Sequence, residues 1–227
     1  MVSGFLSKMK NLVVPRGRAP RRIKAGLLKN LVMNLDLTCD TQLYLGLSER
    51  ELVKWFEKFT SDAVTAIDIG SNVGAYTVWF LARTKASRIL SVEPSPEARE
   101  GLTTNLKLND LHDDPRLTII DKFVGKQDSL DTCSLDSLSA VISTPCVIKI
   151  DVDGPEATIL EGARRVLDRA HVRWIVETHS QDLEEACSQL LTETGYKVEI
   201  VQNAWWRTIV PEQRPIPHNR WLVAARY

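Results

Sequence analysis

Short apolar runs alternate with amphipathic segments from about residue 63 to the end of the chain. The runs are rich in Ile, Val and Leu, which is typical of strands buried on both faces of a parallel sheet. The segments between them carry apolar side chains at helical spacing, so the pattern predicts an α/β fold with helices on both faces. Strands are expected at residues 63–69, 89–92, 117–121, 147–150, 172–177, 196–201 and 221–225, and helices at residues 75–84, 96–109, 154–169 and 181–194.

The last two predicted strands have no helical pattern between them. Residues 202–220 separate them and contain Pro211, Pro215 and Pro217, which disfavour a helix. Since a parallel pair is usually joined by a crossover that contains a helix, the two strands are expected to pair antiparallel at one end of the sheet. The prediction is therefore a seven-stranded, mostly parallel sheet with one antiparallel strand near the C-terminus.

A glycine-containing turn follows the first predicted strand. Residues 65–77 read TAIDIGSNVGAYT, in which the strand ends near Asp68 and a helix begins after Gly74. Glycine permits backbone angles and close approaches that a side chain would block, and a helix start offers free amide donors. The spacing G-x-x-x-G differs from the dinucleotide fingerprint G-x-G-x-x-G, and the chain contains no G-x-x-x-x-G-K-[ST] phosphate loop.

The acids around this turn indicate which cofactor it would hold. A carboxylate at Asp68 suits a cationic cofactor and repels a phosphate. Glu93 ends the second strand, 25 residues later, where an acid can bind the two hydroxyls of a ribose. S-adenosyl-L-methionine has a ribose, a sulfonium and an amino-acid end, and no phosphate. The alternative is a tight strand–helix turn with a buried capping acid. The expected cofactor-binding residues are Asp68, Gly70, Ser71, Asn72 and Gly74 for the methionine end, Glu93 for the ribose, and Asp121 or Lys122 beside the adenine.

Four blocks of the sequence resemble the FkbM family of S-adenosylmethionine-dependent methyltransferases. They are AIDIGSNVGAYT at 66–77, SVEPSPEAREGLTTNLKLN at 91–109, SLDSL at 134–138 and VIKIDVDGPEATILEGA at 147–163. The segment YLGLSERE at 44–51 resembles the family's Gly-x-x-Glu lead-in, and the likeness covers residues 44–176. Asp153 stands where the family more often has Glu. The resemblance implies a Rossmann-like class I methyltransferase fold and a small-molecule or sugar-containing acceptor, such as a polyketide, glycan or glycolipid hydroxyl.

Candidate catalytic residues lie at the ends of the fourth and fifth strands. Asp151 is expected near the transferring methyl, where it positions the acceptor or takes its proton. Glu177 and His179 follow the fifth strand, and His179 is the best candidate base because its ordinary pKa is near neutrality. These three side chains are compatible with a divalent cation, but their spacing does not require one. Asp153 and Glu156 are interpreted instead as a capping box of the following helix.

The first thirty residues are strongly basic. They contain eight Lys and Arg and no acid, although the whole chain has a formal net charge of zero. Residues 1–43 are predicted to be a leader, either a solvated arm or a lid over the acceptor, with a helix at 25–32, ahead of a methyltransferase domain at 44–227. Ser48 and Glu51 have the spacing of a capping box. A nucleic-acid partner is not expected, because Phe5 is the only aromatic residue among these thirty.

Composition adds little more. The four cysteines have no C-x-x-C spacing, which indicates free, mostly buried thiols and a cytoplasmic protein. No apolar run reaches membrane-spanning length. Trp205, Trp206 and Arg207 would form either a wall of the acceptor site or a packing contact of their loop.

The combined expectation is an S-adenosylmethionine-dependent O-methyltransferase. Two alternatives stay open: an RNA or protein methyltransferase recruited by the basic N-terminus, and a nucleotide-binding module without turnover. The acceptor and the oligomeric state are not predicted.

Overall fold

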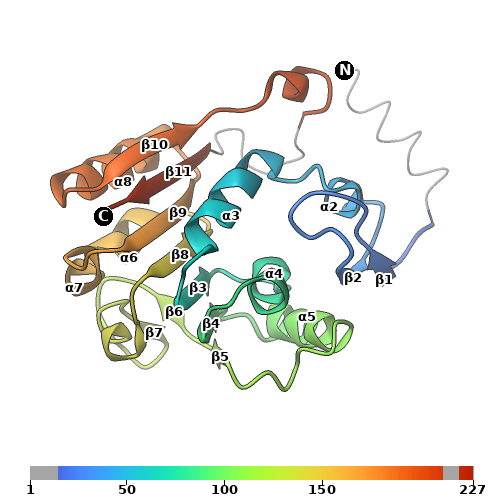
Figure 1. The fold of residues 1–227 in the computed structure, drawn as a ribbon, viewed down its shortest axis with the longest axis horizontal. Coiled ribbons are helices and arrows are strands. Elements are labelled where there is room, and N and C mark those ends of the chain that lie inside the picture. Colours follow the sequence, from blue (N-terminus) through green and yellow to red (C-terminus); the bar gives the residue numbers. More distant parts are fainter. Residues whose placement is uncertain (1–14, 212–219, 227) are drawn as a thin grey trace.

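A seven-stranded sheet in the order β10-β11-β9-β8-β3-β4-β5 forms the centre of the protein (Figure 1). The structure is a computed structural model, and it describes residues 15–211 and 220–226. Strand β11 is antiparallel to both of its neighbours, and the remaining pairs of the sheet are parallel. The predicted fold class and the reversed last strand are therefore confirmed. The strands are β3 Thr65–Ile69, β4 Arg88–Val92, β5 Leu117–Ile120, β8 Cys146–Ile150, β9 Val172–Thr178, β10 Lys197–Val201 and β11 Arg220–Ala225.

Helices cover both faces of this sheet, and alternate strand residues point to opposite faces. On β8, Ile148 packs into the core that includes residues of α6, α7 and α8, whereas Val147 packs into the core that includes residues of α3, α4 and α5. Ser95 caps α5 by accepting a hydrogen bond from the Ala98 amide at 3.2 Å, as its position predicts. The helices are α3 Val53–Thr60, α4 Ala75–Arg83, α5 Pro96–Lys107, α6 Glu156–Glu161, α7 Arg164–Leu167 and α8 Gln181–Glu193.

The N-terminal segment packs against the domain from residue 19 onward. Strands β1 (Ala19–Arg22) and β2 (Val32–Leu35) pair antiparallel, and Ile23 and Met33 are buried in the core beside α3, α4 and α5. The helix predicted at 25–32 is wrong: Gly26 and Asn30 both have φ of 71°, and the chain turns back between the two strands. This part of the leader is therefore not a solvated arm. Residues 1–14 lie outside the described residues, and the domain boundary at residue 43 stays a prediction.

Both predicted capping boxes are wrong. Within the described ranges, neither α3 nor α6 has a side-chain cap. Glu51 instead forms an ion pair with Arg207 at 2.8 Å, and Glu156 contacts His179. In both cases the spacing predicted that the carboxylate caps a helix, whereas the carboxylate contacts a side chain that is distant in the sequence.

The remaining elements are short. The helix predicted at 154–169 is divided into α6 and α7 at Gly162, where a Cβ atom would lie 2.2 Å from the Gly125 carbonyl oxygen. All four cysteines are free and three of them are buried, as expected. The short elements are α2 Thr41–Leu45, β6 Phe123–Val124, β7 Thr132–Cys133 and the 3-10 turns η1 Arg50–Leu52, η2 Ser139–Val141 and η3 Trp205–Thr208.

Candidate active site

The glycine turn connects the end of β3 to the start of α4. Gly70 has φ of 72°, and its amide and that of Ser71 donate to the Val92 carbonyl oxygen at 3.0 and 3.1 Å. A Cβ atom on Gly70 would lie 1.9 Å from the Asp151 carbonyl oxygen. One on Gly74, where φ is 81°, would lie 2.1 Å from a methyl carbon of Leu102. The two glycines therefore let the turn pack closely against β8 and α5.

Glu93 stabilises this turn from the end of β4. Its Oε2 atom accepts a hydrogen bond from the Asn72 amide at 2.8 Å, and its Oε1 atom accepts one from the Ser95 amide at 2.9 Å. The residue is only 7% exposed, yet it lines a cavity. Each carboxylate oxygen has two lone pairs, so Glu93 retains the capacity to accept hydrogen bonds from a ligand.

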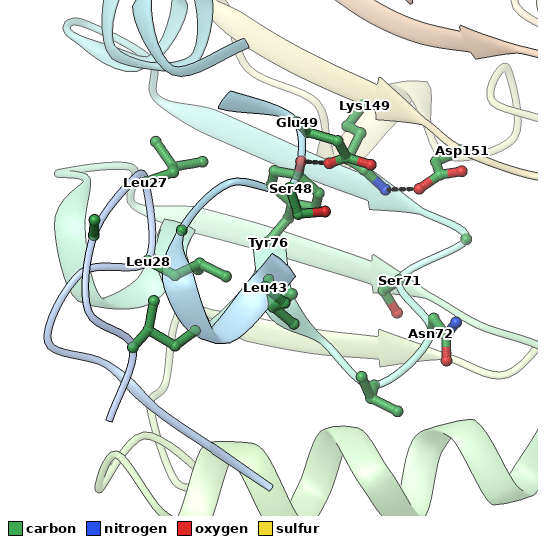
Figure 2. Close-up of a pocket in the computed structure, with 16 residues that line it drawn as sticks. Leu27, Leu28, Leu43, Ser48, Glu49, Ser71, Asn72, Tyr76, Lys149 and Asp151 are labelled. Atoms are coloured by element: carbon green, nitrogen blue, oxygen red, sulfur yellow. Dashed lines mark hydrogen bonds and ion pairs between the residues drawn. The ribbon is translucent and has the colours of Figure 1, made fainter. Parts of the chain in front are cut away.

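Asp68 pairs with a buried lysine on the neighbouring strand. In the register of the parallel sheet Asp68 lies opposite Lys149 on one side and Ser91 on the other. The Lys149 ammonium lies 3.2 Å from Asp68 Oδ1, and Thr77 donates to Asp68 Oδ2 at 2.8 Å. On its other side the ammonium forms an ion pair with Asp151 Oδ2 at 3.1 Å (Figure 2). The cation that the Asp68 carboxylate contacts is therefore a side chain of the protein, that of Lys149.

Asp68, Lys149 and Asp151 form a charged row, and its electrostatics favour the ionised forms of Lys149 and Asp151. Burial alone would lower the pKa of Lys149, but the attraction of Asp151 and Asp68 outweighs it and raises that pKa. Burial alone would likewise raise the pKa of Asp151, and the nearby Lys149 ammonium lowers it below its ordinary value. The ring of Tyr76 lies 4.8 Å from the ammonium, and the hydroxyl of Tyr76 contacts Glu49 (Figure 2).

Asp151, Glu177 and His179 come together at the ends of β8 and β9. One ligand-capable atom of each lies within 4.8 Å of the others. Nδ1 of His179 lies 2.5 Å from Oε1 of Glu156, which is fully buried on α6. This hydrogen bond to Glu156 raises the pKa of His179, although burial opposes the shift. The three candidate catalytic residues predicted from the sequence are therefore neighbours in the structure.

Two cavities meet at the glycine turn. The first, of about 200 Å³, lies beneath the N-terminal segment and α2, and Ile23, Leu28 and Tyr76 are among its lining residues (Figure 2). The second, of about 540 Å³, lies beside Glu93 and Lys122 at the ends of β4 and β5. Gly70, Asn72 and Asp151 line both cavities. The two cavities are therefore neighbours on either side of the turn.

Some predicted site residues lie elsewhere. Asp68 is fully buried behind the turn and Asp121 is exposed, and neither of them lines the two cavities formed by the described residues. Gly74, Glu177 and His179 do not line these cavities either. Ser71 lines the first cavity. Trp205 is 78% exposed, and the Arg207 guanidinium lies 4.2 Å from the ring centroid of Trp206 while it pairs with Glu51.

Lys149 and Glu156 belong to the site but are not among the residues predicted for it. Lys149 had a signal, because it interrupts an otherwise apolar run that is buried on both faces. A lysine is almost never fully buried unless it is paired, so its presence there implied a buried acid nearby. Glu156 had no such signal, since its position just before a helix suited a capping role equally well.

Comparisons with known proteins agree with this architecture. Residues 112–198 match the model of the methyltransferase FkbM domain. No curated protein matches the chain.

None of the helices in the described ranges combines the length and hydrophobicity that crossing a bilayer requires.

Three solved structures have a similar fold. Methyltransferase FkbM from Methylobacillus flagellatus KT has a TM-score of 0.58 at 18% identity; the match covers 72% of this chain and only 44% of that one. Precorrin-6y C5,15-methyltransferase from Geobacter metallireducens GS-15 has a TM-score of 0.55 at 14% identity, with 79% and 90% covered. An rRNA methylase from Streptococcus thermophilus has a TM-score of 0.51 at 12% identity, with 79% and 98% covered. The fold is that of methyltransferases, and the match at residues 112–198 confirms the resemblance to the FkbM family.

Proposed function

We propose that the protein is an S-adenosylmethionine-dependent methyltransferase that methylates a hydroxyl group of a small-molecule or sugar-containing acceptor. The observation that carries this proposal is the junction of the two cavities at Gly70, Asn72 and Asp151. A glycine turn without a phosphate-loop sequence meets an acidic side chain there. This combination suits a ligand with a positively charged centre and no phosphate.

The donor set of the second cavity fits the adenosine part of this cofactor. Glu93 offers carboxylate lone pairs to the ribose hydroxyls, and Lys122 lies beside the space left for the base. Ile69, Val92 and Val124 supply apolar surface in the same cavity. Its volume is within the range of about 300–1,000 Å³ that is usual for ligand pockets.

The methionine end would lie over the turn, toward the first cavity. The backbone of Gly70, Ser71 and Asn72 would hold it there, with Gly74 at the start of α4. Asp68 would act indirectly. Its carboxylate holds the Lys149 ammonium in position, and the ammonium holds the carboxylate of Asp151. The exposed position of Asp121 gives no support to its expected contact with the adenine.

Catalysis would depend mainly on alignment. When bound, the cofactor supplies an electrophilic methyl group on a sulfonium. The reaction would be an in-line displacement, in which the acceptor oxygen would bond to the methyl carbon while sulfur would keep the electron pair of the broken carbon–sulfur bond. Asp151 and Glu177 would position the acceptor for this in-line displacement. His179 would receive the hydroxyl proton on Nε2, because Nδ1 is held by Glu156.

Binding and turnover test the proposal separately. Calorimetry with S-adenosylmethionine and S-adenosylhomocysteine should show one site. Glu93→Gln should weaken both ligands about 10- to 100-fold, since hydrogen bonds to a charged group contribute about 1.5–3 kcal/mol. Glu100→Gln, an exposed acid on α5, is the matched control and should bind as the wild type does.

The two alternatives give different results. A binding module without turnover would bind S-adenosylmethionine but release no S-adenosylhomocysteine with any acceptor pool. An RNA methyltransferase would turn over only with RNA, and its affinity for RNA would fall steeply with salt concentration. Tight binding of NAD or ATP, with neither methyl donor nor product bound, would contradict the proposal altogether.

A further inference from the structure

The first cavity has a polar side and an apolar side. Its polar side is formed by the glycine turn together with Glu49, Lys149 and Asp151. Figure 2 shows Leu27 and Leu28 on the N-terminal segment, away from Lys149 and Asp151. The apolar side comes from this segment and from α2, and its lining residues are Ile23, Ala25, Leu27, Leu28 and Leu43. A ligand that fills the cavity therefore needs both a polar and an apolar part.

Core packing alone does not account for the apolar side. Ile23 and Leu28 are 1% and 6% exposed and belong to the core beside α3, α4 and α5, yet a space of about 200 Å³ lies open next to them. Protein interiors contain few voids larger than a water molecule, because each void forfeits dispersion contacts. The apolar side is therefore better explained as a surface that a ligand covers.

The apolar side is held in a fixed position by direct backbone contacts. Gly26 and Gly46 both have φ of 71°, and a Cβ atom on Gly46 would lie 2.0 Å from the Ala25 carbonyl oxygen. The Lys24 amide donates to the Tyr44 carbonyl oxygen at 3.0 Å. The connection between β1 and β2 thus packs on the C-terminal end of α2 with no room for a side chain between them. Such preformed walls are usual in small-molecule sites.

The proposed cofactor does not use this apolar side. Its methionine end carries an ammonium and a carboxylate group, and its adenosine part is assigned to the second cavity. Neither part has a hydrocarbon group that would cover Leu27 and Leu28. The acceptor has to reach the methyl group near Asp151, which lines both cavities. The apolar side lies in the same cavity as this carboxylate, so it can contact the part of the acceptor next to the reacting hydroxyl.

We propose that the apolar side of the first cavity binds an apolar group, about the size of one six-membered ring, that carries the acceptor hydroxyl. This inference rests on the proposed methyl transfer. A cavity of about 150 Å³ lined by Leu, Ile and Phe binds benzene. The slightly larger first cavity therefore suits a phenol whose hydroxyl points toward Asp151 and whose ring contacts Leu27, Leu28 and Leu43. An unmodified sugar ring is excluded, because its hydroxyl groups would lose water without gaining hydrogen bonds from leucine side chains.

Fluorine NMR with para-fluorophenol tests the inference without any methyl transfer. In the full chain saturated with S-adenosylhomocysteine, the probe should bind saturably; para-cresol should displace it and methyl glucoside should not. Leu27→Gln should weaken probe binding about 10-fold, and Leu27→Trp, which fills the cavity, should abolish it. Leu45→Gln is the matched control, since Leu45 is an α2 leucine that is 42% exposed and does not line the cavity. Circular dichroism checks that each variant is folded.

The outcomes separate this inference from the proposed function. If S-adenosylhomocysteine binds but the probe does not, or if methyl glucoside displaces the probe, the inference is overturned and the proposed function stands. Equal probe affinity in the wild type and both Leu27 variants also overturns it, because the probe then lies elsewhere. Probe binding without any binding of S-adenosylmethionine or its product supports the apolar site and contradicts the proposed function. Should the Leu27 variants not fold, nuclear Overhauser contacts between the probe ring and leucine methyl groups of the wild type decide, and their absence overturns the inference.

Discussion

Replacing Lys149 by methionine tests whether the buried ammonium holds the charged row together. The lysine side chain is 2% exposed and lies between Asp68, which is fully buried, and Asp151, which is 30% exposed. Methionine retains the length and the apolar contacts of the side chain but not the charge. The substitution therefore leaves Asp68 as a buried carboxylate with the Thr77 hydroxyl as its remaining close partner among the described residues.

The expected destabilisation is about 3–5 kcal/mol, the usual effect of removing one partner of a buried ion pair. Most of it should come from Asp68, because solvent reaches the carboxylate of Asp151. With a urea m-value of about 2 kcal/mol/M, the unfolding midpoint should fall by about 1.5–2.5 M. The measurement is urea unfolding followed by circular dichroism and tryptophan fluorescence at neutral pH.

A double variant separates the charge from the packing. Lys149→Met combined with Asp68→Asn removes both charges, while the introduced amide oxygen can still accept from Thr77, so the pair of changes should recover most of the lost stability. Lys107→Met, on the surface of α5, is the control for the loss of a lysine and should change stability by less than about 0.5 kcal/mol. The reasoning is refuted if the single variant loses less than about 1 kcal/mol, or if the double variant is no more stable than the single one.

Two further perturbations address the turn and the C-terminal region. Gly70→Ala should cost more than about 3 kcal/mol in unfolding free energy and weaken S-adenosylmethionine binding, because φ is 72° and the new methyl would meet the Asp151 carbonyl at 1.9 Å. Gly17→Ala is the matched control, since φ is 84° there and the space is open; an equal loss in both variants would show that the backbone angle alone matters. Glu51→Gln should cost about 1.5–3 kcal/mol at neutral pH, because Arg207 hydrogen-bonds to that carboxylate. Although burial opposes the shift, the Arg207 contact lowers the pKa of Glu51, so its contribution is complete above the unfolded pKa of about 4.3 and is lost as the pH falls through the lower folded pKa. Unfolding measured from pH 3 to 7 should show the difference between wild type and variant shrinking in acid, and a difference that is constant with pH would contradict this assignment.

Much of the fold could be predicted because its signals are local. The buried strands β3 and β8 read as mostly apolar runs, each interrupted by one charged residue, Asp68 or Lys149, and Ser95 caps α5 as its position indicated. The positions of Asp151, Glu177 and His179 followed from the same reasoning, since the ends of parallel strands meet at one edge of the sheet. Their proximity in the structure is a consequence of strand order.

Local signals also produced the errors. The segment at 25–32 has the composition of a helix, but two residues with positive φ and the pairing of β1 with β2 turn it back on itself. Glu51 and Glu156 had the spacing of capping residues, and each instead contacts a side chain from a distant part of the chain, Arg207 and His179 respectively. The spacing within a short window does not reveal these partners, because they come close only when the chain is folded.

The sequence by itself determined the alternation of strands and helices, the glycine turn and the set of acids near it, since these follow from periodicity and residue type within short windows. Only the tertiary structure decided which charged side chains contact one another. Asp68 and Lys149 are 81 residues apart in the chain, and they are neighbours because β8 lies beside β3 in register. The same packing placed Glu156 behind His179 and the N-terminal segment over the first cavity. Contacts of this kind depend on strand order and on which face of the sheet each helix covers, and no local pattern in the sequence encodes either of them.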